Sequence, residues 1–335
     1  MSKKKVVILK NDRTGDLFVS LRAINQIINK HSDQPIAIFL SNINHKFSFL
    51  FPTLEKIVIP MDLSLIIKIK VFIYILFNKI DTVYILSPKN FYYYLAFFFR
   101  KVKFYAITIK AKKSRPSKFL LKYLYKFIEL DRLNIKKRKS SYEIQEKLID
   151  SNISKNNLSN NAKKLNNFIF PKNYIFFHYK KNLFENLLGW NLQQIYSFLD
   201  FISKRYENVL FSSEFEDKEI NNYFSENYNT YNFDNGEKNF FNNKNIFFLK
   251  NIDGYDLFNA VEKSTKIISP EGIISHMGYY LKKPVLALMH FNLKNRQDFI
   301  NQIISCKEWF PPNNYSFIVL KKDFDRSMIK LSKRI

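Results

Sequence analysis

The sequence has 335 residues, of which 46% are hydrophobic, so its length predicts two domains and its composition permits a proper core in each. Lys and Arg number 54 against 29 Asp and Glu, and the resulting net charge of +25 favours an anionic partner: nucleic acid, anionic lipid or a phosphorylated substrate. The alternative is an AT-rich coding bias, because much of the excess is Lys spread among Asn, Ile and Phe. The single cysteine, Cys306, excludes an internal disulfide framework and a cysteine-based metal site.

The first 109 residues alternate between strand-like and helical patterns. Residues 6–9 are a continuous apolar run, typical of a buried parallel strand, and residues 17–28 place their apolar side chains on one helical face. The apolar run is too short for a signal peptide, so an intracellular protein is expected. Strands are then expected at 36–40, 57–59, 81–86 and 103–109, with helices at 63–77 and 91–99. This alternation predicts an α/β fold with a doubly wound sheet.

Two stretches of this half have an unusual composition. Residues 63–77 are the most apolar part of the chain but fall short of the ~20 residues that a membrane span requires. We interpret them as a core helix with two lysines reaching solvent, with an interfacial helix as the alternative. Residues 110–138 are basic and are expected to be helical, either as a solvated charged face or as a surface for an anionic membrane.

The second half repeats the alternation after a polar, Asn-rich linker at 151–167. We therefore expect two domains, 1–167 and 168–335, with the last helix a candidate to pack back on the first. The expected strands are 174–179, 208–211, 246–249, 266–269, 284–289 and 315–320, and the expected helices are 192–203, 216–224, 255–262 and 274–281.

Three of the six glycines lie in two similar segments. Gly15 precedes Asp16 just after the first strand, and Gly272 and Gly278 flank the start of the helix after strand 266–269. Both segments run from a strand through a carboxylate-bearing turn into a helix, the place where open α/β sheets bind ligands.

Asp16 has two interpretations. As a functional residue, it is a general base that takes a proton from an acceptor hydroxyl, with Asp12 as the rival carboxylate. As a structural residue, it is the N-cap of the first helix.

The second segment favours a diphosphate at a helix N-terminus, where free N–H groups and the helix dipole attract anions. Ser275 would add a hydrogen bond, and Glu271 would point toward sugar hydroxyls. The alternatives are a capping carboxylate at Glu271 and a structural histidine at His276.

These segments resemble glycosyltransferase family 9, the ADP-heptose:lipopolysaccharide heptosyltransferases. The opening strand with Gly15-Asp16 is similar to the start of that family, and residues 267–288 are similar to its carboxy-terminal signature of strand, Asp-Ser/Thr-Gly-x-x-His, helix and Pro-Val. Gly189-Trp190 resembles the family's Lys-x-Trp segment.

The resemblance implies a GT-B fold, with two Rossmann-like domains facing a central cleft, the first for the acceptor and the second for the nucleotide sugar. It makes Asp16 the catalytic base, with the backbone of Arg13, Thr14 and Gly15 approaching the acceptor. The implied donor-binding residues are Glu271, Gly272, Ile273, Ile274, Ser275, His276, Lys180, Lys181 and Glu216. For the two lysines the alternative is that they are ordinary surface charges of a basic protein.

Four positions depart from the family pattern and leave the donor open. The signature aspartate is Glu271, its glycine has moved to Gly272, the Lys of Lys-x-Trp is Leu188, and Arg22 replaces a frequent proline.

The implied activity is inverting and metal-independent transfer of heptose or another sugar, without a cofactor, from a nucleotide donor to a lipid-linked glycan such as lipopolysaccharide core. Such an enzyme would act in the cytoplasm, peripherally on the inner face of the membrane. The alternatives are a non-catalytic relative that binds sugar nucleotides and a basic nucleic-acid-binding protein. No nucleic-acid partner is expected, because the sequence lacks the usual recognition motifs.

Overall fold

The computed structural model describes residues 4–111, 116–134, 139–149, 169–214, 218–239, 245–291 and 296–335. The chain divides into two compact units, Met1–Ala162 with Gln297–Phe310, and Lys163–Arg296 with Pro311–Ile335. Each unit is built around its own sheet and its own hydrophobic core. The linker expected at 151–167 lies outside the described residues.

The first unit has a parallel sheet in the order β3-β2-β1-β4-β5-β6. Its strands are β1 (Lys5–Lys10), β2 (Ile36–Ser41), β3 (Glu55–Ile59), β4 (Ile80–Ile85), β5 (Lys103–Lys110) and β6 (Lys126–Asp131). The chain winds outward from β1 in one direction and from β4 in the other. The topological switch point therefore lies between the carboxyl ends of β1 and β4.

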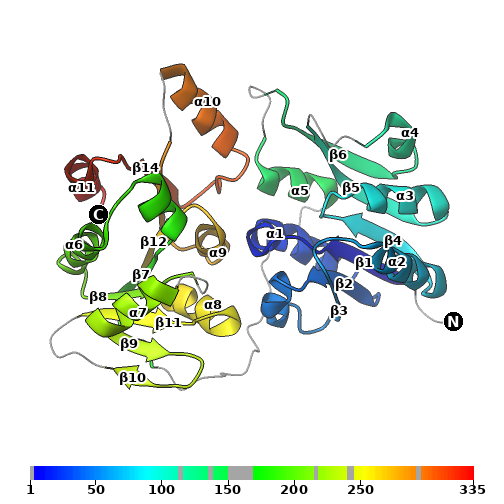
Figure 1. The fold of residues 1–335 in the computed structure, drawn as a ribbon. Coiled ribbons are helices and arrows are strands. Elements are labelled where there is room, and N and C mark those ends of the chain that lie inside the picture. Colours follow the sequence, from blue (N-terminus) through cyan, green and yellow to red (C-terminus); the bar gives the residue numbers. More distant parts are fainter. Residues whose placement is uncertain are drawn as a thin grey trace. The chain divides into compact units, whose positions relative to one another are not determined.

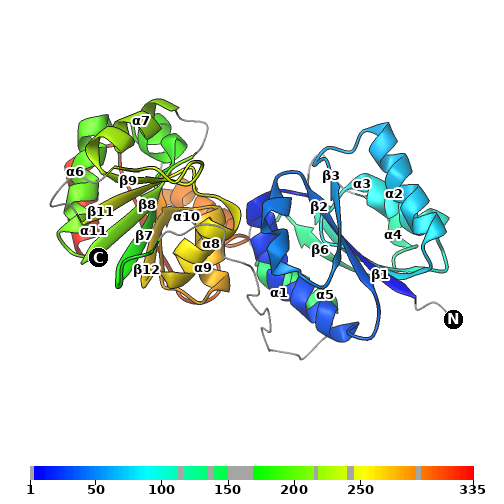
Figure 2. The ribbon, with the colours of Figure 1, turned by 90° about the horizontal axis from the view of Figure 1, so that it is seen from below.

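Helices cover both faces of this sheet. On one face lie α1 (Thr14–Lys30) and α5 (Ser141–Ile149), and on the other α2 (Leu65–Phe77), α3 (Asn90–Phe98) and α4 (Lys118–Leu121) (Figure 1, Figure 2). A 3₁₀ segment, Asn44–Leu50, follows β2.

The structure corrects both interpretations of the unusual stretches. Among the described residues of 110–138, only Lys118–Leu121 are helical, and β6 pairs with β5 from Tyr105 opposite Lys126 to Lys110 opposite Asp131, so pairing in the sheet overrides the helical spacing. Residues 63–77 do form the expected helix, but it is not a core helix, because only Val71 and Ile75 of α2 are buried.

The second unit has the sheet order β10-β9-β11-β8-β7-β12-β13-β14, and among its described strands only the β10–β9 pair is antiparallel. Its strands are β7 (Tyr174–His178), β8 (Asn208–Ser212), β9 (Asn229–Asn232), β10 (Lys238–Asn239), β11 (Ile246–Lys250), β12 (Lys266–Pro270), β13 (Val285–Met289) and β14 (Tyr315–Val319). Its helices are α6 (Leu192–Ser203), α7 (Lys218–Asn227), α8 (Gly254–Lys263), α9 (Ile273–Tyr280) and α11 (Phe324–Ser332), with a π-helical turn at Asn182–Leu187. The switch point of this sheet lies between β7 and β12.

The segment that joins the first unit late in the chain is not the last helix. Residues Gln297–Phe310, which include most of α10 (Arg296–Cys306), belong to the first unit, where the Ser141 N–H donates to the Glu308 carbonyl at 2.8 Å. The last helix, α11, stays with the second unit because Leu331 is buried in that core and Phe324 packs against Trp190.

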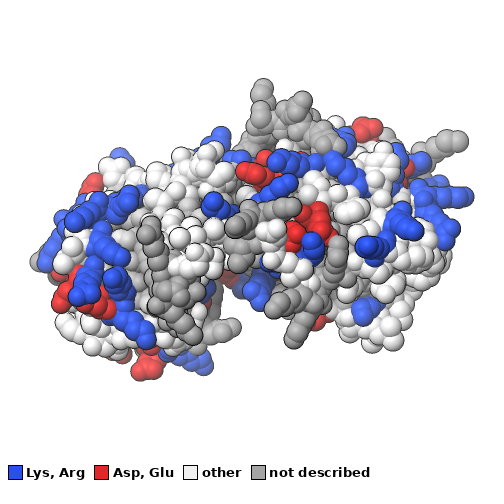
Figure 3. Space-filling view, turned by 90° about the horizontal axis from the view of Figure 1, so that it is seen from above, with Lys and Arg blue, Asp and Glu red and all other residues white. Residues whose placement is uncertain are grey.

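These findings confirm an α/β fold of two doubly wound sheets. Among the described residues, no helix has the length and apolar character needed to cross a bilayer. Basic side chains are spread across the face shown in Figure 3 and do not gather in one place.

Gly278 gives a test of the packing between α9 and its sheet. A Cβ at this position would clash with the side chains of Ile267 and Val285. We expect Gly278→Ala to lower the free energy of unfolding by ~1–3 kcal/mol in urea titrations, since overpacking a core forces its neighbours to shift.

Ile267→Val is the matched partner in a double-mutant cycle, because it removes the nearest clashing methyl group. The double variant should lose less stability than the sum of the two single variants, and simple additivity would contradict the packing account.

Candidate functional site

The loop after β1 is held in place by buried polar residues. The Asn44 amide donates to the carbonyls of Lys10 and Asp12 at 2.9 and 3.1 Å, and the Ser41 hydroxyl donates to the Asp12 carbonyl at 2.7 Å. Because these bonds satisfy the backbone between strand and helix, the start of α1 has a fixed position at the carboxyl edge of the sheet.

Asp16 lies in the first turn of α1 and is not its N-cap. The N-cap is Arg13, whose extended backbone leads into the helix without a side-chain cap. Thr14 and Gly15 are the first helical residues, and the Thr14 hydroxyl donates to the Ile43 carbonyl at 3.5 Å. A carboxylate in the first turn of a helix is stabilised by the helix dipole.

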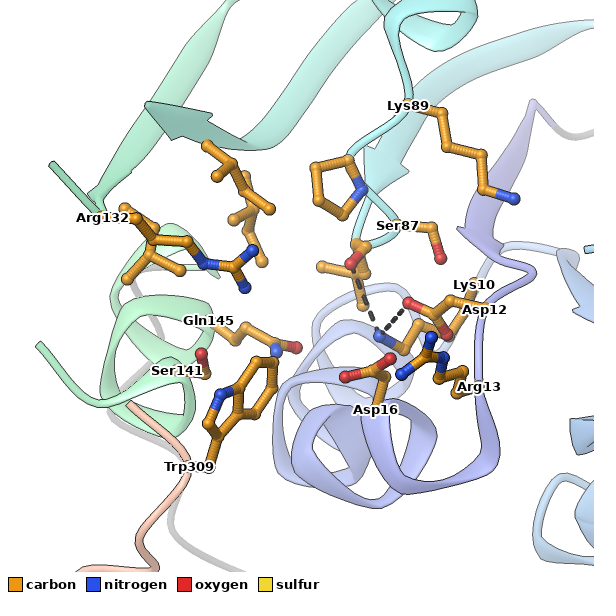
Figure 4. A pocket seen from close by; sticks show the side chains of 15 residues that line it. Lys10, Asp12, Arg13, Asp16, Ser87, Lys89, Arg132, Ser141, Gln145 and Trp309 are labelled. Atoms are coloured by element: carbon orange, nitrogen blue, oxygen red, sulfur yellow. Dashed lines mark hydrogen bonds and ion pairs between the residues drawn. The ribbon is translucent and has the colours of Figure 1, made fainter. Parts of the chain in front are cut away.

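Asp16 lines a cavity of about 410 Å³ at the switch point of the first unit. Figure 4 shows its carboxylate pointing into the space between the end of β1 and the residues of α5 and the 297–310 segment. The polar and aromatic residues that line the cavity are Lys10, Asp12, Arg13, Asp16, Ser87, Lys89, Arg132, Ser141, Gln145 and Trp309.

A buried ion pair forms one wall of this cavity. Lys10 Nζ lies 2.8 Å from Asp12 Oδ2, and the Lys10 side chain is only 2% exposed. The pair compensates the charge of Asp12, which makes Asp12 a poor candidate for proton transfer. Lys89, which also lines the cavity, donates to the carbonyls of Asn11 (3.0 Å) and Met61. Burial lowers the pKa of Lys89.

The opposite wall joins residues that are far apart in the sequence. Arg132 Nε donates to both carboxylate oxygens of Glu308 at 3.0 and 3.1 Å, and its guanidinium lies 5.7 Å from the ring centre of Trp309. Three of the lining residues also have a buried polar atom without a hydrogen-bond partner among the described residues, namely Asp12 Oδ1, Ser87 Oγ and Gln145 Oε1, but these atoms have almost no accessible surface and do not face the cavity. The lining as a whole mixes carboxylate, hydroxyl, amide and cationic side chains, which suits a ligand rich in hydroxyl groups.

The second unit gathers polar residues at its own switch point. Phe177 of β7 pairs with Ile268 of β12, so the residues that follow these strands lie close together. Glu271 Oε1 lies 3.4 Å from Nε2 of the buried His276. Burial acts to raise the pKa of Glu271, but the hydrogen bond from His276 and the charges of His276 and Lys180 outweigh it and lower the pKa.

The turn into α9 depends on Gly272, whose φ of 152° L side chains rarely adopt. The Gly272 N–H donates to the Ser275 hydroxyl at 3.1 Å, and that hydroxyl donates to the Gly272 carbonyl at 2.7 Å. The Ser275 side chain is therefore engaged in its own helix cap. Ile273 is half-buried and Ile274 is buried.

The two candidate lysines differ in their surroundings. The charge of Lys180 lowers the pKa of both Glu271 and His178, so Lys180 belongs to the polar cluster at the strand ends. Lys181 lies 3.7 Å from Glu185 in the π-helical turn. Glu216, the remaining candidate, lies outside the described residues.

Sequence reasoning missed several residues of both clusters. His178 ends β7 with Nδ1 2.9 Å from the Ser212 hydroxyl, and burial together with Lys180 lowers its pKa to about 4. His178, like Ser87 and Lys89, is a polar residue at or just after the end of an apolar strand, a signal that could have found them. Arg132 and Trp309 carry no such signal.

The sequence matches no family model and no curated protein. Among solved structures, the family 9 glycosyltransferase from Veillonella parvula shares 15% identity at a TM-score of 0.61, covering 100% of this chain and 90% of that one. The E. coli heptosyltransferase WaaC with ADP shares 10% identity at a TM-score of 0.62, covering 99% of this chain and 100% of that one. The UDP-GlcNAc 2-epimerase from Methanocaldococcus jannaschii shares 13% identity at a TM-score of 0.52, covering 98% of this chain and 92% of that one.

These likenesses confirm the GT-B fold that the sequence resemblance implied. At such low identities they concern the fold, which is common to transferases and an epimerase. That the two units face a common cleft stays a prediction.

The lowered pKa of His178 predicts a pH dependence of stability. An unfolded histidine binds a proton below pH ~6.5, whereas folded His178 stays neutral down to about pH 4. The free energy of unfolding should therefore fall as pH drops from 6.5 to 4, by up to ~1.4 kcal/mol per pH unit for this group.

His178→Gln removes that proton-linked contribution while keeping a polar side chain beside Ser212. Urea unfolding at pH 7, 6 and 5 should show a shallower loss of stability in the variant. Equal slopes would contradict the neutral state of His178 in the folded protein.

Proposed function

We propose that the chain is a glycosyltransferase that moves a sugar from a nucleoside-diphosphate donor to a hydroxyl of a glycan acceptor. The observation that supports it best is that both units of the GT-B fold carry polar clusters at their switch points, one around a cavity with Asp16 and one around Lys180 and Glu271. A neighbour of the same fold binds ADP, which is consistent with nucleotide binding.

The acceptor would occupy the cavity of the first unit. Its lining hydroxyl and amide side chains, Ser87, Ser141 and Gln145, match sugar hydroxyls, and the cations Arg13 and Lys89 suit an acceptor that carries phosphate or carboxylate groups. A lipid-linked glycan such as lipopolysaccharide core combines these properties.

The donor would occupy the switch point of the second unit. The N-terminus of α9 and the Lys180 ammonium would stabilise the diphosphate, and the anionic Glu271 would accept hydrogen bonds from the donor sugar. His276 would hold Glu271 in position.

In the reaction, Asp16 would remove the proton of the acceptor hydroxyl as that oxygen attacks the anomeric carbon of the donor sugar. The bond from this carbon to the diphosphate oxygen breaks, and the configuration inverts. The leaving diphosphate takes up the bonding electron pair, and its charge is stabilised by Lys180 and the α9 dipole without a metal ion. Heptose and other sugars fit this scheme equally well.

The first experiment is to identify the donor. Thermal-shift titrations with ADP-, GDP-, UDP- and CDP-linked sugars should find one that stabilises the protein. Product analysis then separates transfer from 2-epimerisation, the activity of a neighbour with the same fold, and from binding without turnover.

Asp16→Asn tests the catalytic base. We expect turnover to fall by at least ~10²-fold, since an amide cannot accept the proton, while donor affinity measured by calorimetry stays unchanged. Asp33→Asn, an exposed carboxylate of the same unit, is the matched control and should keep full activity. Full activity in the Asp16 variant would refute this mechanism.

A pair of lysine variants tests the donor site. Lys180→Gln should weaken the binding of the free nucleoside diphosphate by about tenfold or more, because it removes the cation whose charge acts on Glu271 at the proposed donor site. Lys181→Gln should have a much smaller effect, since Lys181 is paired with Glu185. Equal losses in the two variants would count against a specific role for Lys180.

A further inference from the structure

The outward side of α2 is apolar and exposed. Leu65, Ile66, Ile69, Ile73, Leu76 and Phe77 are 46–78% exposed. At about 100° per residue these six positions fall within an arc of roughly 120°, opposite the buried Val71 and Ile75. The helix thus packs on its sheet with one side and presents a second apolar side to its surroundings.

This apolar surface continues over the neighbouring helices. Tyr94 and Phe98 of α3 and Phe119 of α4 are at least half exposed. The Phe98 ring lies 5.7 Å from Phe72 of α2, and Phe119 lies 5.5 Å from Phe97, so contacts link the three helices, which lie side by side in Figures 1 and 2. We call the exposed apolar side chains of α2, α3 and α4 the outer apolar face. Contiguous apolar surface of this kind marks a binding site.

Basic side chains surround this face. On α2, Lys70 and Lys68 lie on either side of the apolar arc, as the helical period requires. Arg100 lies over the rings of Phe97 and Tyr123 at 5.4 and 5.2 Å, and the remaining exposed cations nearby are Lys101, Lys118 and Lys122.

Cations outnumber carboxylates around this face. The described cations of α2, α3 and α4 and of the turns that follow them are Lys68, Lys70, Lys79, Arg100, Lys101, Lys118 and Lys122. The carboxylates beside them are Asp81, which lies 3.1 Å from Lys4, and Glu55, which accepts from the Tyr74 hydroxyl of α2 and lies 2.7 Å from Lys5. A second copy of the chain docked here would bring two basic rims together, whereas an anionic lipid surface offers apolar tails at the centre and phosphates at the rim.

We propose that the outer apolar face docks on an anionic lipid bilayer, with α2 lying in the plane of the interface. Its 13 residues span only ~20 Å, too short to cross the hydrocarbon core. The apolar side chains enter the boundary between headgroups and acyl chains, and the flanking cations contact lipid phosphates. This inference does not rest on the proposed transferase activity, because membrane binding is measured without substrate.

Co-sedimentation with vesicles tests the proposal. The full chain should bind vesicles of phosphatidylcholine with 30% phosphatidylglycerol and not vesicles of phosphatidylcholine alone, and binding should weaken as salt is raised. The triple variant Ile69→Gln, Ile73→Gln, Phe77→Gln should bind at least tenfold more weakly. Ile329→Gln, an exposed apolar residue of α11, is the matched control and should bind normally.

A charge pair completes the design. Lys70→Gln with Lys122→Gln should weaken binding by about fivefold per lysine, whereas Lys322→Gln with Lys333→Gln, exposed lysines of the second unit, should have little effect. Circular dichroism and thermal unfolding check that each variant is folded, which we expect because the substituted side chains are solvent-exposed.

Several results would overturn the proposal. These are no binding to anionic vesicles, undiminished binding by the folded α2 variant, or equal effects of the two lysine pairs. Light scattering provides a further test. If the chain self-associates, the α2 substitutions abolish this self-association and no vesicle binding is seen, the face belongs to a second copy of the chain.

Discussion

Parallel pairing at the two switch points decides where chemistry is possible in this chain. β1 pairs with β4, and β7 pairs with β12, at the places where each sheet reverses its direction of winding. No crossover helix covers the carboxyl ends of strands at such a point, so side chains there border an open space. The polar residues at the cavity and at the Glu271 cluster follow from this geometry.

The charged residues gathered at these strand ends are stabilised by pairing with neighbouring residues. Lys10 is buried but bonded to Asp12, Arg132 is bonded to the buried Glu308, and Glu271 is held by His276. Since a buried charge without a partner is strongly destabilising, these pairs make the clusters compatible with a stable fold. His178 instead remains uncharged.

The sequence was sufficient for the features that local patterns encode. Apolar runs and helical periods predicted most strands and helices, and the strand–turn–helix rule placed Asp16 beside a cavity and Glu271 at a switch point. It failed where distant contacts decide. Residues 126–131 became a strand because β5 offered a pairing edge, and α2 was read as core because composition cannot show which side of an apolar helix is covered.

The wall of the cavity formed by Arg132, Glu308 and Trp309 has a consequence for how the protein folds during synthesis. Glu308 and Trp309 are made after β13 of the second unit, yet they belong to the first. During synthesis, the first sheet can form early, but Arg132 can pair with Glu308 only when nearly the whole polypeptide has left the ribosome. The pocket therefore matures last, and neither half of the gene alone encodes it.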